Sequence, residues 1–323
     1  MLVALMLFFA VKAGAGELTV KKVARNAVRI IYHEGEVKDT LPDWLYVKHT
    51  EVPDCDVQVE IDNASQMVTL KDRKGNIRFQ ATRHELKDGC ATLAFCSPED
   101  ECLYGLGQFQ DGYSNVRGLS RRLTQVNTQI SMPMLLSSKG YGILWNNYGL
   151  TEFNPCNESV TLTKREGKSS QEVVNITTTE GGRQEVRERN IYEASFEVAE
   201  SGDYALLLDV GQKMARRHNL TIDGETVIEM QNLWLPPTAS KIVHLEAGRH
   251  QLTAELAKGD APVLYYNKVT DQTVFRSPLA QKVDYTVFLG SADEVIATYR
   301  DLTGNAPLMP DWALGYIHCR ERF

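Results

Sequence analysis

The residues of this chain that could do acid–base chemistry or bind a metal are carboxylates and histidines, and they are scattered. The densest acidic run, Glu99-Asp100-Glu101, is typical of a solvated turn. Asp209 and Asp223 stand apart, without the D-x-D-x-D spacing that supplies oxygen ligands in a calcium loop. The histidines of strand-like segments have no nucleophile pattern beside them, which favours surface positions; they are His84, His218, His244 and His250. The sequence therefore predicts no catalytic residue, no metal and no cofactor in this chain.

The six cysteines also lack a metal-binding pattern, because none of them forms a C-x-x-C pair. Cys90, Cys96 and Cys102 recur at six-residue intervals, and the polar segment Ser97-Pro98-Glu99-Asp100 interrupts them, which predicts a hairpin. Two interpretations stay open for these residues: a disulfide across the hairpin after export, or unpaired and half-buried thiols.

Length and composition indicate a globular protein of about two domains. The chain has 323 residues, of which 43% are apolar, so it can bury sizeable cores. Its net charge of -7 disfavours a nucleic-acid or anionic-membrane partner, since phosphate contacts require a basic surface. The two arginine pairs, Arg121-Arg122 and Arg216-Arg217, are isolated, and we expect them to be solvated.

The N-terminal segment Leu2–Val11 is apolar but too short to span a bilayer. Followed by the small residues Ala13-Gly14-Ala15, it is typical of a signal peptide, which we assign to residues 1–15. The alternative is a buried core strand. Export to the periplasm or the extracellular space follows from the first interpretation, and the lack of a cysteine at the cleavage site argues against a lipid anchor.

Hydrophobic patterning predicts an all-β fold. From Leu18 to about Val160 the apolar stretches are short, alternate with polar residues and end at turn residues, as in an antiparallel β-sandwich. A second sandwich is expected over 167–275, with a hairpin at Asp223-Gly224. The predicted domains are thus a first sandwich at 16–166, an inserted sandwich at 167–275, and a closing part at 276–304.

The closing part is expected to contain a strand at Asp284–Leu289 and one short helix at Glu294–Leu302. Ser291 lies in the expected N-cap region and Gly304 at the stop. Beyond a proline-bounded linker, Asp311–Ile317 is predicted to be a buried strand, which assigns residues 305–323 to the start of a further domain.

Several motifs resemble glycoside hydrolase family 31, in the order in which that family has them. They are Leu103-Tyr104-Gly105-Leu106-Gly107, then the stretches Gln125–Met134 and Ser137–Trp145, and finally Pro307–Gly315. The second and third resemble the α-xylosidase branch most, and the last resembles the family's entry into its TIM barrel. The resemblance implies a galactose-mutarotase-like first sandwich. Within 167–275, Gly202-Asp203-Tyr204 and Leu245–His250 are similar to a protective-antigen-like sugar-binding module.

The glycines of these motifs suit bends at strand ends, because glycine tolerates positive φ and close backbone approach. The bends are expected at Gly105 and Gly107 and again at Gly140 and Gly142. We assign them no ligand role.

The resemblance implies a retaining hydrolase of α-glycosidic bonds whose two catalytic aspartates lie on later strands of the barrel. Those strands are not in this chain, so the missing C-terminal barrel is an expected partner and the chain alone is predicted to be inactive. The implied substrates are xyloglucan-type oligosaccharides that carry α-linked xylose. Two alternatives remain: a stand-alone carbohydrate-binding protein, and an α-glucosidase of the same family.

Four residues are candidate substrate contacts. By resemblance, the loop Gln125–Gln129 reaches toward the active-site mouth with Asn127 and Thr128. Trp234, in a proline-stopped loop of the insert, could stack on a sugar ring. Phe323 could line the pocket from the first barrel strand. For each of the four, a purely structural role is the alternative.

Overall fold

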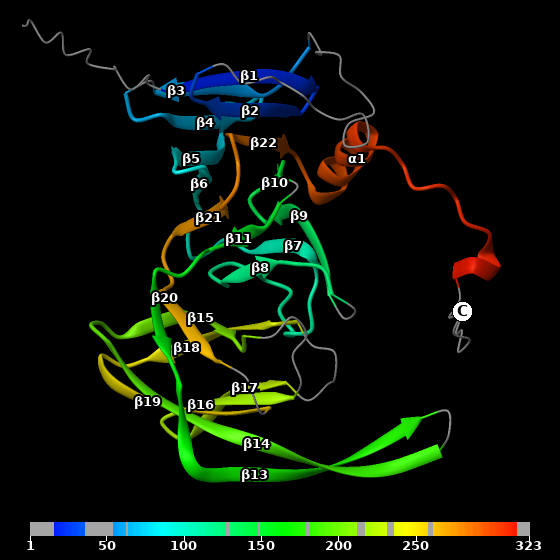
Figure 1. The fold of residues 1–323 in the computed structure, drawn as a ribbon. Helices are drawn as coiled ribbons and strands as arrows, with labels where there is room; N and C mark the ends of the chain where they lie inside the picture. Colours follow the sequence, from blue (N-terminus) through cyan, green and yellow to red (C-terminus); the bar gives the residue numbers. More distant parts are fainter. Residues whose placement is uncertain are drawn as a thin grey trace, which may run out of the picture.

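The computed structural model describes residues 16–35, 54–62, 64–126, 129–147, 149–178, 181–211, 217–230, 236–257 and 261–314. In these residues, four antiparallel sheets form two β-sandwiches, accompanied by one α-helix and one short 3-10 helix (Figure 1). The predicted all-β fold of two sandwiches is confirmed. The predicted signal peptide at 1–15 lies outside the described residues, among which no helix is long and apolar enough to cross a membrane.

The first sandwich pairs a six-stranded sheet with a seven-stranded sheet. In spatial order the six-stranded sheet contains β1 (Glu17–Ala24), β2 (Ala27–His33), β22 (Lys282–Leu289), β10 (Tyr141–Trp145), β9 (Ile130–Ser137) and β7 (Leu103–Gln108). The seven-stranded sheet contains β3 (Gln58–Asp62), β4 (Met67–Lys71), β5 (Ile77–Lys87), β6 (Cys90–Cys96), β21 (Gln272–Ser277), β11 (Thr151–Phe153) and β8 (Arg121–Leu123).

The second sandwich pairs a four-stranded sheet with a five-stranded sheet. The four-stranded sheet contains β12 (Glu158–Thr161), β20 (Val263–Lys268), β15 (Gly202–Asp209) and β18 (Thr238–Leu245). The five-stranded sheet contains β13 (Thr163–Thr178), β14 (Gly181–Val198), β19 (Gly248–Ala257), β16 (His218–Ile222) and β17 (Glu225–Met230). The predicted hairpin between β16 and β17 is present, with Asp223 and Gly224 at positive φ as an Asp-Gly turn requires.

The second sandwich is inserted between β11 and β21, which are neighbours in the seven-stranded sheet. By strand pairing, the chain passes to the second sandwich between Phe153 and Glu158 and returns between Lys268 and Gln272. The expected boundaries were 167 and 275. The strands β12 and β21 lie just after the two transitions, respectively, and their sheet is decided by partners far away in the sequence, β20 and β6.

Alternation along each strand separates core from surface. On β2, Val28 and Ile30 lie in the core between the two sheets, whereas Ala27 packs under the helix on the opposite, outer face. Arg29 also faces outward and is almost fully buried, where its Nη2 lies 2.6 Å from Oδ2 of Asp284 on β22. A buried charge of this kind is tolerated only when it is paired.

The single α-helix of the described residues, α1 (Ala292–Thr303), confirms the predicted helix and its caps. Ser291 accepts a hydrogen bond from the backbone of Glu294, whose side chain accepts from the backbone of Ser291, so the two form a capping box. Gly304 ends the helix at positive φ. Val295 and Leu302 are buried against the outer face of the six-stranded sheet.

Two local predictions were wrong. The strand expected from Asp311 begins instead as a 3-10 helix, η1 (Asp311–Leu314), in which Ala313 N donates to Pro310 O at 2.8 Å; residues 315–317 lie outside the described part. A strand needs a neighbour for its backbone groups, whereas Pro310 has the φ of a helical turn. The hairpin expected between Cys90 and Cys102 is a crossover, because β6 and β7 belong to opposite sheets.

Candidate functional site

The two sandwiches meet along a ladder of four charged side chains. Arg276 on β21 contacts Glu152 on β11 at 2.6 Å, and Glu152 lies 3.9 Å from Arg122 on β8. Arg122 then pairs with Asp209 at the end of β15, in the second sandwich. The ladder forms because Glu152 is the register partner of both arginines in the seven-stranded sheet.

Neutral contacts support the same junction. Ser240 Oγ donates to the carbonyl oxygen of Ser120 at 2.5 Å, and the backbone N–H of Ile242 donates to the hydroxyl of Tyr113 at 3.2 Å. Gly118 approaches Val269 so closely that an added Cβ would lie 2.8 Å from its Cγ1. These contacts hold β18 and the loops of the first sandwich in one arrangement.

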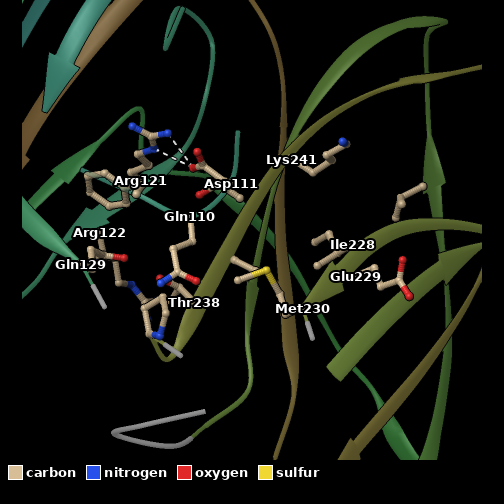
Figure 2. A pocket seen from close by; sticks show the side chains of 15 residues that line it. Gln110, Asp111, Arg121, Arg122, Gln129, Ile228, Glu229, Met230, Thr238 and Lys241 are labelled. Atoms are coloured by element: carbon tan, nitrogen blue, oxygen red, sulfur yellow. Dashed lines mark hydrogen bonds and ion pairs between the residues drawn. The ribbon is translucent and has the colours of Figure 1, made fainter. Parts of the chain in front are cut away.

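A cavity at this junction, the junction pocket, is the candidate site that the described residues form between the sandwiches. It is lined by Phe109, Gln110, Asp111, Arg121, Arg122, Gln129, Val227, Ile228, Glu229, Met230, Pro236, Thr238, Ala239, Ser240 and Lys241. Figure 2 shows Arg121 and Asp111 on the wall from the first sandwich and Ile228 and Met230 on the opposite wall. Its cavity volume is about 110 Å³. Typical ligand pockets measure roughly 300–1,000 Å³, so the junction pocket by itself does not hold an oligosaccharide.

Several polar groups of the junction pocket already have partners in the protein. Arg121 donates from Nε and Nη2 to Oδ2 of Asp111, at 3.1 and 2.6 Å, and lies 4.2 Å over the ring of Phe109. Burial lowers the pKa of Arg121 from its usual value, and Asp111 opposes that effect. Gln129 is buried and donates to the carbonyl oxygen of Thr124 at 2.8 Å. Arg121, Asp111 and Gln129 thus bind partners within the first sandwich.

The structure corrects two expectations about charged residues. Arg121 was expected in solvent, but it is 2% exposed, because Asp111 pairs with it. The acidic run is solvated at Asp100, whereas Glu101 is buried and accepts a hydrogen bond from Tyr141 Oη at 2.6 Å. Sequence patterns miss both, since the partners lie at a distance along the chain.

The histidines were expected at the surface, and three of the four are buried. His84 and His218 lie inside the first and second sandwich respectively, and His250 packs against Phe196 while its Nδ1 contacts Asp223 at 2.6 Å. Only His244 of these four is exposed, beside Asp203. Strand alternation turns the other three inward.

The cysteine alternatives are decided for the described residues. Cys55, Cys90, Cys96, Cys102 and Cys156 are all free and partly buried, so the interpretation as unpaired thiols is confirmed for them. Burial raises the pKa of the Cys156 thiol to about 11, which keeps it protonated and unreactive at neutral pH.

The four candidate substrate contacts, Asn127, Thr128, Trp234 and Phe323, all lie outside the described residues. The residues that flank the first two, Val126 and Gln129, exchange backbone hydrogen bonds at 3.2 and 3.4 Å. Gln129 brings this loop to the junction pocket, which the sequence did not indicate. The substrate contacts themselves remain predictions.

The glycines of the family-like motifs are needed for steric reasons, because neighbouring atoms leave no room for a side chain. A Cβ on Gly105 would lie 2.4 Å from Met134 O, and one on Gly107 would lie 2.1 Å from Ile130 O, so β7 can approach β9 only with glycine there. A Cβ on Gly142 would lie 2.5 Å from Val295 Cγ1, where α1 packs on β10.

Comparisons with known proteins agree with this architecture, although no family model matches the chain. An alpha-xylosidase from Saccharolobus solfataricus is 24% identical over 345 residues, which cover 97% of this chain and 32% of that protein. An uncharacterized family 31 glucosidase from Pseudescherichia vulneris is 44% identical over 61 residues, covering 19% of this chain and 12% of that protein. The crystal structure of a GH31 alpha-xylosidase from Xanthomonas citri matches 94% of this chain and 40% of its own, with a TM-score of 0.70 and 22% identity.

These likenesses show that the two-sandwich fold of the described residues is similar to part of carbohydrate-cleaving enzymes. More narrowly, the chain is similar along nearly its whole length to part of an α-xylosidase, and its fold is similar to part of a GH31 alpha-xylosidase. Nearly the whole of this chain matches the Saccharolobus solfataricus α-xylosidase, but the match spans only about a third of the length of that protein.

Proposed function

We propose that this chain is the N-terminal, non-catalytic part of a retaining α-glycosidase that removes α-linked xylose from xyloglucan-type oligosaccharides. The observation that carries the proposal is the likeness to a GH31 alpha-xylosidase over 94% of the chain, in which both sandwiches take part. In this proposal the full-length protein, meaning this chain continued by a catalytic barrel, is exported.

The first sandwich would support the barrel, and its Gln125–Gln129 loop would reach the mouth of the active site. The second sandwich would extend the substrate cleft beyond the bond that is cleaved. The ladder from Arg276 to Asp209 supports such a role, because it fixes the second sandwich relative to the first. An extension of a cleft is useful only if its position is fixed.

Catalysis would belong to the barrel. A retaining glycosidase needs two carboxyl groups roughly 5–5.5 Å apart, one as nucleophile and one as acid and base. Three carboxylates of the junction, Asp111, Glu152 and Asp209, are each paired with an arginine instead. We therefore expect no hydrolysis by this chain alone.

The test compares this chain with the full-length protein on aryl α-xylosides, aryl α-glucosides and xyloglucan oligosaccharides, with aryl β-xylosides as the control substrate. We expect xylose release with retention of configuration by the full-length protein and none by the chain. Release of xylose by the purified chain would contradict its non-catalytic role. A preference for α-glucosides would favour the α-glucosidase alternative, and oligosaccharide binding without any hydrolysis by the full-length protein would favour a binding protein.

A further inference from the structure

Another cavity, the Glu101 pocket, lies in the first sandwich and shares no lining residue with the junction pocket. It is formed around the start of β5, the end of β6 and the start of β21, together with the segments that precede β7 and β10. Its lining consists of Ile77, Arg78, Phe79, Gln80, Cys96, Pro98, Glu101, Lys139, Asp271 and Gln272. The cavity volume is about 390 Å³, within the roughly 300–1,000 Å³ of typical ligand pockets.

Glu101 contributes a buried carboxylate to this pocket, since the residue is only 2% exposed. Ser137 Oγ and Tyr141 Oη both donate to Oε1 of Glu101, the latter at 2.6 Å. The other oxygen, Oε2, accepts no hydrogen bond in the described part of the chain. Because Ser137 and Tyr141 do not line the pocket, Oε1 is turned toward the protein and Oε2 is the oxygen left to face the pocket.

A buried carboxylate with one bare oxygen is unusual in a folded protein. Buried polar atoms nearly always have a hydrogen-bond partner, and a buried charge costs free energy unless donors surround it. Ser137 and Tyr141 satisfy only one of the two oxygens of Glu101. Since the described residues supply no donor for Oε2, we expect the donor to belong to a molecule that enters the pocket.

The charges of the lining are balanced, which argues against an ion as the ligand. The lining carries two cationic and two anionic side chains. Apart from Glu101, each of them forms an ion pair with a residue outside the pocket: Arg78 with Asp72 at 2.9 Å, Lys139 with Asp100, and Asp271 with Arg117 at 2.8 Å. A pocket with this balance has no net charge with which to attract a cation or an anion.

A hydroxyl group fits these surroundings, because it can donate to Glu101 Oε2 and accept from a lysine or amide N–H in the same pocket. The side-chain amides are those of Gln80 and Gln272, and the apolar side chains are those of Ile77, Phe79 and Pro98. We propose that the Glu101 pocket binds a neutral, hydroxyl-rich ligand of the size of a monosaccharide unit, with one ligand hydroxyl donating to Glu101 Oε2. This inference goes beyond the function proposed above, because it requires no catalytic barrel.

The experiment titrates this chain with D-xylose, D-glucose and cellobiose, with acetate and ethylammonium as charged controls, and follows the backbone amides of the lining by two-dimensional NMR. Glu101→Gln keeps a carbonyl oxygen for Tyr141 but turns the second oxygen into a donor, so the sugar affinity should fall at least about tenfold. Ile77→Arg obstructs the pocket from a side chain that is 54% exposed, so the affinity should fall while the melting temperature hardly changes. Leu279→Arg is the matched control, since Leu279 is 85% exposed and lies outside the lining.

Shifts of the lining amides that only the sugars cause, and that Glu101→Gln and Ile77→Arg weaken, support the proposal. No shift with any sugar overturns it, because Glu101 Oε2 then meets only water. Shifts that persist equally in both variants overturn it as well, because the sugar then binds elsewhere, and so does tighter binding of acetate or ethylammonium. Sugar binding in this pocket without α-xyloside hydrolysis by the full-length protein supports the pocket and contradicts only the proposed function.

Discussion

At the scale of single residues, His84 shows how a buried polar group is satisfied in the core of the first sandwich. Its Nδ1–H donates to the carbonyl oxygen of Gln66 at 2.9 Å, and its Nε2 accepts from the hydroxyl of Tyr285 at 2.8 Å. The rings of His84 and Tyr285 also stack, with centroids 5.7 Å apart. Both ring nitrogens have partners in the neutral form, and burial lowers the pKa of His84 from 6.5 to about 4.

This shift predicts that stability falls as the pH drops from about 6.5 to about 4. Between these two pH values, His84 is protonated in the unfolded chain but stays neutral in the folded chain, so a lower pH favours unfolding. The full effect is about 3 kcal/mol, at 1.36 kcal/mol for each pH unit between the two pKa values. Urea unfolding at several pH values should show the slope, and His84→Gln should flatten it. His244→Gln, at an exposed histidine, is the control, and an equally steep slope in the His84 variant would contradict the assignment.

At the scale of secondary-structure elements, β7 owes its position to glycine. Gly105 and Gly107 have φ of +120° and +106° and lie against the backbone of β9, where any side chain would collide. Between them Leu106, also at positive φ, is fully buried in the core. The resemblance of this motif to a family signature was visible in the sequence, but its steric reason appears only when β9 is placed beside β7.

Gly107→Ala is therefore expected to detach β7 from β9 and to lower the melting temperature clearly. The added Cβ would lie 2.1 Å from Ile130 O, in addition to the cost of roughly 1–2 kcal/mol for an L-residue at positive φ. Gly89→Ala separates the two effects, because Gly89 has φ of +75° and no atom within 4 Å of the new Cβ. Thermal unfolding of both variants tests this prediction. An equal decrease in melting temperature for Gly107→Ala and Gly89→Ala would show that the contact with Ile130 O has no effect.

At the scale of the whole molecule, the junction ladder joins two sandwiches that each have their own core. The ladder itself is polar, so its contribution to the junction depends on keeping its charges paired. Arg122 is the central member, because it contacts both Glu152 and Asp209 and lies 5.2 Å over the ring of Tyr265.

Arg122→Met should weaken the junction and let the second sandwich unfold separately. We expect a loss of about 1–3 kcal/mol, between the values for exposed and fully buried ion pairs, since Asp209 and Glu152 are 21% and 17% exposed. Calorimetry should then resolve two transitions. Arg165→Met removes a pair with Glu193 on the exposed β13–β14 hairpin and should leave the profile unchanged. A single transition in both variants would show that the ladder does not couple the sandwiches.

The sequence by itself determined the strand-rich class, the two sandwiches, the capped helix α1 and the Asp-Gly hairpin, because alternation, turn residues and caps are local signals. Tertiary structure alone decided that β11 and β21 are neighbours across the inserted sandwich, that Glu101 and His84 are buried, and that Arg122 reaches Asp209. Those outcomes depend on partners brought together from distant parts of the chain, as when Trp145 Nε1 donates to Ser277 Oγ at 3.0 Å, and no local pattern encodes such a meeting.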